Sequence, residues 1–105
     1  VLLENLTSSA DFVLEATYVG VPDEKWGEIP MALVKVMAGM NKTEEDVLKY
    51  LQEEGVDKGK ITKWMLPVYV AFVDDIPKTS VGKFNKLEVR KNMDAFVKKA
   101  KRVRL

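Results

Sequence analysis

The sequence predicts an α+β fold, a small domain with a short, three-stranded, mainly antiparallel sheet flanked by helices. Short apolar runs rich in β-formers alternate with segments that have the spacing of amphipathic helices. The first two apolar runs lie too close together for a parallel crossover, which favours antiparallel pairing. With 105 residues the chain has room for one domain. We expect residues 1–98 to fold and residues 99–105 to form a basic tail.

The first half of the chain contains the end of a helix and two predicted strands. Residues 1–9 carry leucines at the spacing expected for the end of an amphipathic helix. Residues 12–21 and 31–37 are rich in β-formers and predict two strands. Residues 22–30, between them, begin and end with proline, so we expect a rigid connecting loop there.

The second half of the chain predicts two helices around a third strand. Thr43 precedes three acidic residues, so we expect it to cap a helix that ends near Gly55. Residues 68–73 predict the third strand. From Lys86 to Ala100 apolar residues recur at helical spacing, which predicts one continuing helix.

Composition excludes several classes of function. The chain has no Cys and no His, which removes disulfides, thiol catalysis, imidazole bases and nearly all zinc sites, and no metal site is predicted. No window approaches 18 uncharged apolar residues, and the first residues do not resemble a signal peptide, so we expect a cytoplasmic protein. Because the sequence does not begin with Met, we expect it to be a fragment of a longer protein.

Charge is unevenly distributed along the chain. Residues 78–105 contain ten Lys or Arg and two acidic residues, whereas residues 1–77 contain seven and fourteen. A basic segment of this kind either meets an anionic partner or forms a solvated face. The last residues, from Lys98 to Arg104, allow the same two interpretations: a nucleic-acid or membrane contact, or a solvated helix end whose cations complement the helix dipole.

A polar segment after the third predicted strand is the strongest candidate for an anion site. Residues 75–86 contain several hydroxyl and cationic side chains around Lys83, which directly follows Gly82. A nucleotide-binding P-loop is excluded, because Pro77 stands where its first glycine should be and Phe84 follows the lysine. From the residues alone, Lys83 is either a solvated surface lysine or the ligand-contacting group of the loop.

Three motifs in order give this sequence a resemblance to a known family. Residues 77–83, Pro-Lys-Thr-Ser-Val-Gly-Lys, resemble the closing motif of the adenylate-forming enzymes, which include acyl-CoA synthetases, luciferases and peptide-synthetase adenylation domains. Residues 20–30, Gly-Val-Pro-Asp-Glu-Lys-Trp-Gly-Glu-Ile-Pro, resemble a second family motif. Residues 63–67, Lys-Trp-Met-Leu-Pro, resemble the segment before the third strand. Within the superfamily the sequence looks most like the C-terminal domain of medium- and long-chain fatty acyl-CoA synthetases.

The resemblance implies a small mobile domain that works with a large N-terminal domain. The parent enzyme would use ATP with Mg²⁺ to convert a fatty acid to an acyl-adenylate, and then CoA would displace AMP. ATP and CoA would be bound mainly by the N-terminal domain, so we expect this fragment alone to be inactive. Lys83 matches the lysine needed for acyl-adenylate formation and is the predicted catalytic residue.

The resemblance also implies residues that contact the cofactors. Thr79 and Gly82 belong to the lysine motif, and Trp64 stands where many relatives have an aromatic residue that stacks on the CoA adenine. Trp26 corresponds to a position that lines the pantetheine tunnel in some relatives. Core packing is an equally good interpretation of both tryptophans. The sequence departs from the family at Leu66, where a basic residue is common.

Two further residues are candidates for contacts between domains or with phosphate. Glu28 is expected either to pair with a basic residue at the domain interface or to be solvated. Lys86 stands where many relatives have Arg, so a phosphate contact there would lose bidentate geometry.

Two alternative functions remain open at this point. The domain could come from another adenylate-forming branch, such as a short-chain or aryl acid–CoA ligase or a peptide-synthetase adenylation domain. It could instead be a stand-alone basic binding module for nucleic acid or a partner protein. We expect no transmembrane segment and no nucleic acid partner, and the sequence does not determine the acyl chain length or the oligomeric state.

Overall fold

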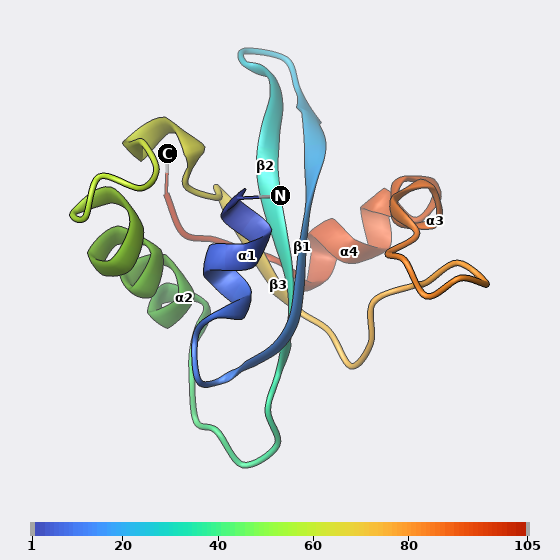
Figure 1. Cartoon of the computed structure of the whole chain (residues 1–105). Helices are drawn as coiled ribbons and strands as arrows, with labels where there is room; N and C mark the ends of the chain where they lie inside the picture. The colour runs from blue at the N-terminus through green and yellow to red at the C-terminus, as the bar shows by residue number, and fades with distance from the viewer. Residues whose placement is uncertain (1, 105) are drawn as a thin grey trace.

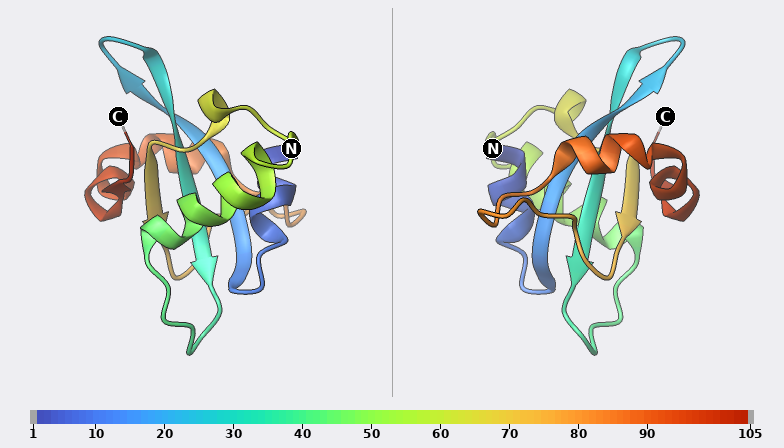
Figure 2. Two further views of the ribbon diagram at one scale, coloured as in Figure 1. Left: turned by 90° about the vertical axis from the view of Figure 1, so that its left-hand side faces the viewer. Right: turned by 90° about the vertical axis from the view of Figure 1, so that its right-hand side faces the viewer.

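A computed structural model describes residues 2–104 and confirms the predicted α+β fold. Val1 and Leu105, the ends of the predicted domain and tail, lie outside the described residues. A sheet forms the middle layer, helices α1 and α2 cover one face, and helices α3 and α4 cover the other (Figures 1 and 2). The elements are α1 (Leu2–Ser8), β1 (Val13–Asp23), β2 (Gly27–Val36), α2 (Glu44–Leu51), β3 (Tyr69–Phe72), α3 (Lys86–Lys91), α4 (Met93–Lys99) and β4 (Lys101–Arg102).

The sheet has four strands in the order β1-β2-β3-β4, one more than predicted. Strands β1 and β2 form an antiparallel hairpin, as the short spacing predicted. Strands β2 and β3, however, are parallel, because the connection between them includes α2 and is long enough to cross over. The sheet is therefore mixed rather than mainly antiparallel.

The predicted loop at residues 22–30 is wrong for most of its length. Strand β1 continues to Asp23 and β2 begins at Gly27, so only three residues form the turn. The Asp23 carboxylate accepts hydrogen bonds from the backbone N–H groups of Lys25 (3.0 Å) and Trp26 (2.8 Å), which stabilises this turn. Pro22 is tolerated because β1 is an edge strand, where a missing N–H group leaves no partner unsatisfied.

Two apolar clusters, one on each face of the sheet, form the core. Met31 and Leu33 of β2 point to the α3–α4 side, whereas Ala32 and Val34 point to the α1–α2 side, and all four are fully buried. This strict alternation with both faces buried explains why β2 reads as a nearly continuous apolar run.

Helix α2 begins as its sequence predicted. The Thr43 hydroxyl accepts a hydrogen bond from the Asp46 N–H, and the Asp46 carboxylate accepts one from the Thr43 N–H, which together form a capping box. The regular α-helix ends at Leu51 and continues as one wider turn over Gln52–Val56. Gly55 lies inside that turn, where a Cβ atom would come within 2.7 Å of Leu6, so close packing requires the glycine.

The predicted single helix from Lys86 is wrong, because α3 and α4 are separated at Asn92. The Asn92 side chain donates a hydrogen bond to the Glu88 carbonyl (3.0 Å). This side-chain bond competes with the backbone hydrogen bonds of a continuous helix. Lys98 and Lys99 end α4, as the helix-end interpretation expected, but the tail beyond them is not helical: residues 101–102 form β4, which pairs with β3. The longest α-helix, α2, has eight residues, and no helix within residues 2–104 is long and apolar enough to cross a membrane.

Candidate functional site

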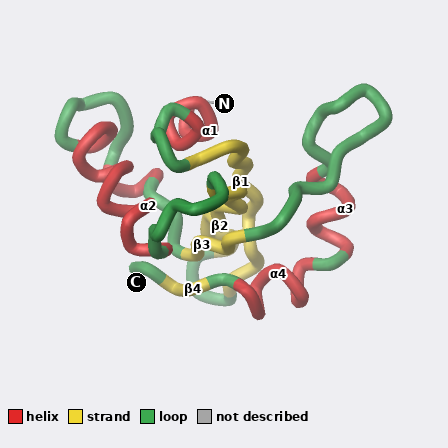
Figure 3. Tube along the Cα trace, turned by 90° about the horizontal axis from the view of Figure 1, so that it is seen from below, coloured by secondary structure: helices red, strands yellow, loops and turns green. Residues whose placement is uncertain are grey.

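Residues 77–85, here called the lysine loop, connect the end of the β3 segment to α3 and project away from the sheet (Figure 3). The loop is a small hairpin in which Lys78 and Phe84 form an isolated β-bridge. Thr79 N–H donates to the Lys83 carbonyl (2.7 Å), and Gly82 N–H donates to the Thr79 carbonyl (3.0 Å). These backbone hydrogen bonds close the turn and place Lys83 next to its tip.

Gly82 gives this turn its shape. Its φ angle is +84°, a conformation that residues with a Cβ atom rarely adopt. A Cβ atom at this position would meet no other atom within 4 Å, so the requirement for glycine is conformational and not steric. Of the predicted site residues, Thr79, Gly82 and Lys83 are therefore brought together by one local turn.

The three lysines around the loop have different environments. Lys78 is bound to acidic side chains, and Lys86 lies 3.6 Å from the Glu4 carboxylate. Lys83 is exposed, and no acidic partner lies within ion-pair distance of it in the part of the chain that the structure describes. Lys83 is thus the lysine of this group whose ammonium is available to an external anion.

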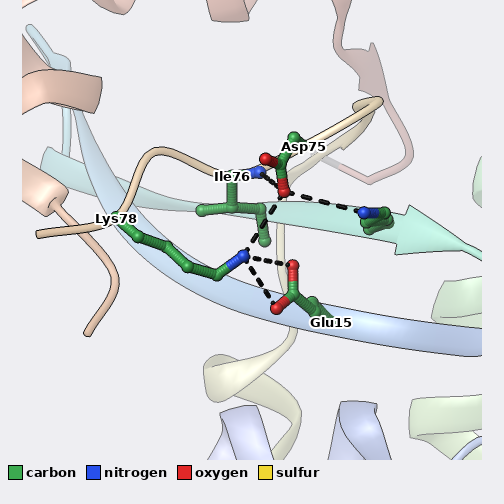
Figure 4. A network of polar contacts seen from close by, with 5 residues as sticks. Glu15, Asp75, Ile76 and Lys78 are labelled. Carbon is green, nitrogen blue, oxygen red and sulfur yellow. Dashed lines mark hydrogen bonds and ion pairs between the residues drawn. The ribbon is translucent and has the colours of Figure 1, made fainter. Parts of the chain in front are cut away.

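Lys78 lies at the centre of a small ionic network (Figure 4). Its ammonium contacts both oxygens of the Glu15 carboxylate (3.0 and 2.9 Å) and one oxygen of Asp75 (3.4 Å). That Asp75 oxygen also accepts from the Ile76 N–H (3.0 Å) and lies 3.7 Å from the Lys35 ammonium. The hydrogen bond that Lys78 donates to Glu15 raises the pKa of Lys78, and the hydrogen bond that Lys78 donates to Asp75 lowers the pKa of Asp75.

A second group of predicted residues forms an open pocket, here called the tryptophan pocket. Trp26 comes from the β1–β2 turn and Trp64 from a short 3₁₀ helix (Lys63–Met65), and both line the pocket. Trp26 is 54% exposed and Trp64 is 76% exposed, so the core-packing interpretation of both residues is wrong. The full lining is Trp26, Glu28, Ile29, Pro30, Trp64, Val68 and Arg104.

The tryptophan pocket contains no residue of the lysine loop, so the predicted site residues separate into two places. Arg104 is the cation of the pocket, and its buried Nε atom has no hydrogen-bond partner among the described residues. The Leu66 side chain is buried in the core on the α1–α2 side and offers no polar group to the pocket. The pocket therefore combines two accessible indole surfaces with one guanidinium group.

Two residues of these sites were not predicted from the sequence. Glu15 is the acidic residue of an otherwise largely apolar predicted strand, and this unexplained charge was the only signal that pointed to it. Arg104 was noted only as part of the basic tail, and nothing local linked it to the tryptophans, because β4 brings it back to residues 36 to 78 positions earlier. Glu28, predicted either to pair at the domain interface or to be solvated, lines the tryptophan pocket, and its carboxylate would lie 2.7 Å from a Cβ atom at Gly20.

Residues 2–83 match the family model of the AMP-binding enzyme C-terminal domain. The chain is 37% identical to 2-methylpropanoate–CoA ligase of Humulus lupulus over 84% of its own length and 15% of that protein. It is 33% identical to the mitochondrial medium-chain acyl-CoA ligase ACSF2 of Rattus norvegicus, over 91% of the chain and 15% of the relative. Among solved structures, a fatty acyl-CoA synthetase of Mycobacterium tuberculosis superposes with a TM-score of 0.74 and 29% identity, over 89% of this chain and 17% of the other.

Proposed function

The chain belongs to the family of AMP-binding enzyme C-terminal domains, and we propose that it is the mobile domain of an ATP-dependent fatty acid–CoA ligase in which Lys83 promotes acyl-adenylate formation. The chain spans about 15% of the length of the curated relatives that it matches, so a larger N-terminal domain would hold ATP with Mg²⁺, the fatty acid and much of CoA. The fragment alone would then be inactive. For the parent ligase we also propose a cytoplasmic location.

The observation that carries this proposal is the availability of Lys83. Its neighbours Lys78 and Lys86 are paired with acidic side chains, whereas Lys83 is exposed and lacks an acidic partner among residues 2–104. An ammonium on a flexible stem, presented next to the tip of a projecting turn, can enter a site that belongs to another domain.

The reaction requires such a cation at one point. An oxygen of the fatty acid carboxylate attacks the α-phosphorus of ATP, a new oxygen–phosphorus bond forms, and the bond to the leaving pyrophosphate breaks. Lys83 would contact both the carboxylate and the α-phosphate, align them, and neutralise charge as the phosphorus becomes five-coordinate. In the second step the CoA sulfur attacks the acyl carbon and AMP leaves, and Lys83 has no comparable part in it.

The tryptophan pocket would contribute to the second step. Its exposed indole rings could stack on an adenine base, and the Arg104 guanidinium could bind a phosphate group of CoA. The apolar, buried side chain of Leu66 cannot supply that charge, so Arg104 is the cation of the pocket that remains to do so. Thr79 and Gly82 act differently, since they hold the turn that presents Lys83.

The proposal is tested with Lys83→Ala in the full-length parent ligase. Pyrophosphate release from ATP and a fatty acid should fall by at least about 100-fold, because removing one preorganised charge from a transition state has effects of this size. Thioester formation from added acyl-adenylate and CoA should change far less. Lys98→Ala removes another exposed lysine, on α4, and is the matched control. Pyrophosphate release near the wild-type rate in Lys83→Ala would show that Lys83 does not have this role.

A further inference from the structure

The lysine loop touches the rest of the domain through few side chains, of which Phe84 packs against the buried cluster on the α3–α4 side. Residues 78–83 are all exposed, whereas Ile76 before the loop and Val89 after it are buried. The hydrogen bonds inside the turn fix its shape but not its direction relative to the sheet. The direction of Lys83 therefore depends on whatever holds the base of the hairpin.

Lys78 is the residue at that base, and it contacts three separate parts of the domain. Its ammonium binds the Glu15 carboxylate on β1 and the Asp75 carboxylate before the loop. It also lies 6.0 Å from the centre of the Phe84 ring on the returning arm of the hairpin. Thr79, the next residue, donates to the carbonyl of Lys83 (2.7 Å). One side chain thus connects the sheet to both arms of the hairpin.

The position of Glu15 depends on an irregularity of the sheet. The β1–β2 register shifts between Val13 and Glu15, so a bulge lies immediately before Glu15. After the bulge, Glu15 shares its face of the sheet with Val19 and Val21, which pack on the α3–α4 side. This is the side on which the lysine loop enters α3 (Figure 2), so the bulge directs an acidic side chain toward the base of the loop.

We propose that Glu15 is a positioning residue for adenylation: by holding Lys78 at the base of the hairpin, it fixes the direction in which Lys83 is presented to the active site. This inference rests on the proposed role of Lys83. Glu15 does not contact substrate, and it acts through Lys78 alone. Asp75 assists from the other side of the ammonium, but it is 68% exposed and more distant, so Glu15 is the main partner.

The test uses the full-length ligase and measures the two half-reactions separately. Glu15→Gln and Lys78→Met should each slow pyrophosphate release by about tenfold, because small misplacements of a reacting group have effects of this order. Thioester formation from added acyl-adenylate should stay within about twofold, since Lys83 does not take part in it. Lys78→Arg keeps the charge and both contacts, so it should restore most of the adenylation rate.

The double variant Glu15→Gln/Lys78→Met separates a shared role from two independent ones. If both residues act through one contact, the double variant should be no slower than either single variant. Glu54→Gln removes the carboxylate of another surface ion pair, with Lys58 (2.8 Å), and is the matched control. Equal loss in both half-reactions, no loss at all, or additive losses in the double variant would each overturn the proposal.

The outcome of Lys83→Ala distinguishes a failure of this inference from a failure of the proposed function. If Lys83→Ala removes adenylation while Glu15→Gln does not slow it, the function stands and the positioning role is wrong. If Lys83→Ala leaves adenylation unchanged, the proposed function itself is wrong.

Discussion

The lysine loop and the tryptophan pocket are built in opposite ways. The lysine loop consists of consecutive residues whose own backbone closes the turn, and an ionic network and the packing of Phe84 against the core attach it to the sheet. The tryptophan pocket is lined by residues from the β1–β2 hairpin, the segment around Trp64 and Val68, and the end of the chain at Arg104. The loop presents one cation on a flexible stem, whereas the pocket offers exposed aromatic surface.

This difference matches the two steps of the proposed reaction. A projecting loop suits a group that must enter another domain for one step and leave afterwards. A surface assembled from the sheet and its flanking segments suits a ligand that binds along the domain itself. We therefore expect substitutions in the loop to change adenylation and substitutions in the pocket to change the use of CoA.

The largest effect that separates the two regions is expected from Trp64→Ala in the full-length ligase. Loss of a stacking platform for a base typically removes about 1–3 kcal/mol, so the KM for CoA should rise roughly 10- to 100-fold. Pyrophosphate release in the absence of CoA should not change. Trp64→Phe keeps an aromatic surface and should retain most of the affinity. An equal loss in both half-reactions would contradict the separation of loop and pocket.

A smaller effect, in the opposite half-reaction, is expected from Gly82→Ala. A left-handed backbone conformation at a residue with a Cβ atom is unfavourable by about 1–2 kcal/mol, so adenylation should slow by roughly five- to thirtyfold. The KM for CoA should stay near the wild-type value. Gly39 has nearly the same φ angle, +83°, and equally open surroundings in the turn after β2. Gly39→Ala is therefore a matched control that strains the backbone away from both regions.

The same contrast explains how much could be predicted from the sequence. The capping residue Thr43 and the turn at Gly82 depend on neighbours within a few positions, and both were predictable from local pattern. Local pattern also explains why the order of helices and strands was predicted correctly as far as α3. Residues 22–30 were misassigned because proline at both ends suggested a loop. Pro22 lies in β1, an edge strand that tolerates it, and Pro30 precedes Met31, the first residue of β2 that pairs with β3.

Contacts between residues distant in the sequence account for the features of the fold and the site that were not predicted. The parallel pairing of β2 with β3, the addition of β4 and the position of Arg104 all depend on where the chain returns in space. The ion pair between Glu15 and Lys78 joins residues 63 positions apart. Periodicity and composition carry no information about such pairings, so the residue that holds the lysine loop could be identified only from the structure.

The smallest effect concerns the ionic network of the loop, and pH is the variable that tests it. Lys78, with smaller contributions from the Ile76 N–H group and Lys35, lowers the pKa of Asp75 below its ordinary value of 3.8, while Glu15 occupies the other side of the Lys78 ammonium. A group whose pKa is lowered by folding stabilises the fold above its ordinary pKa and loses this contribution as pH falls through its folded-state pKa. The free energy of unfolding of wild type should therefore exceed that of Asp75→Asn above pH 3.8 by a constant amount, and the difference should shrink at lower pH.

Urea denaturation of the 105-residue chain at a series of pH values measures this difference. In a Lys78→Met background the main cause of the shift is gone, so the pH-dependent part of the difference should largely disappear. If it persists at full size there, Lys78 is not the residue that binds Asp75, and the loop is attached to the sheet in some other way.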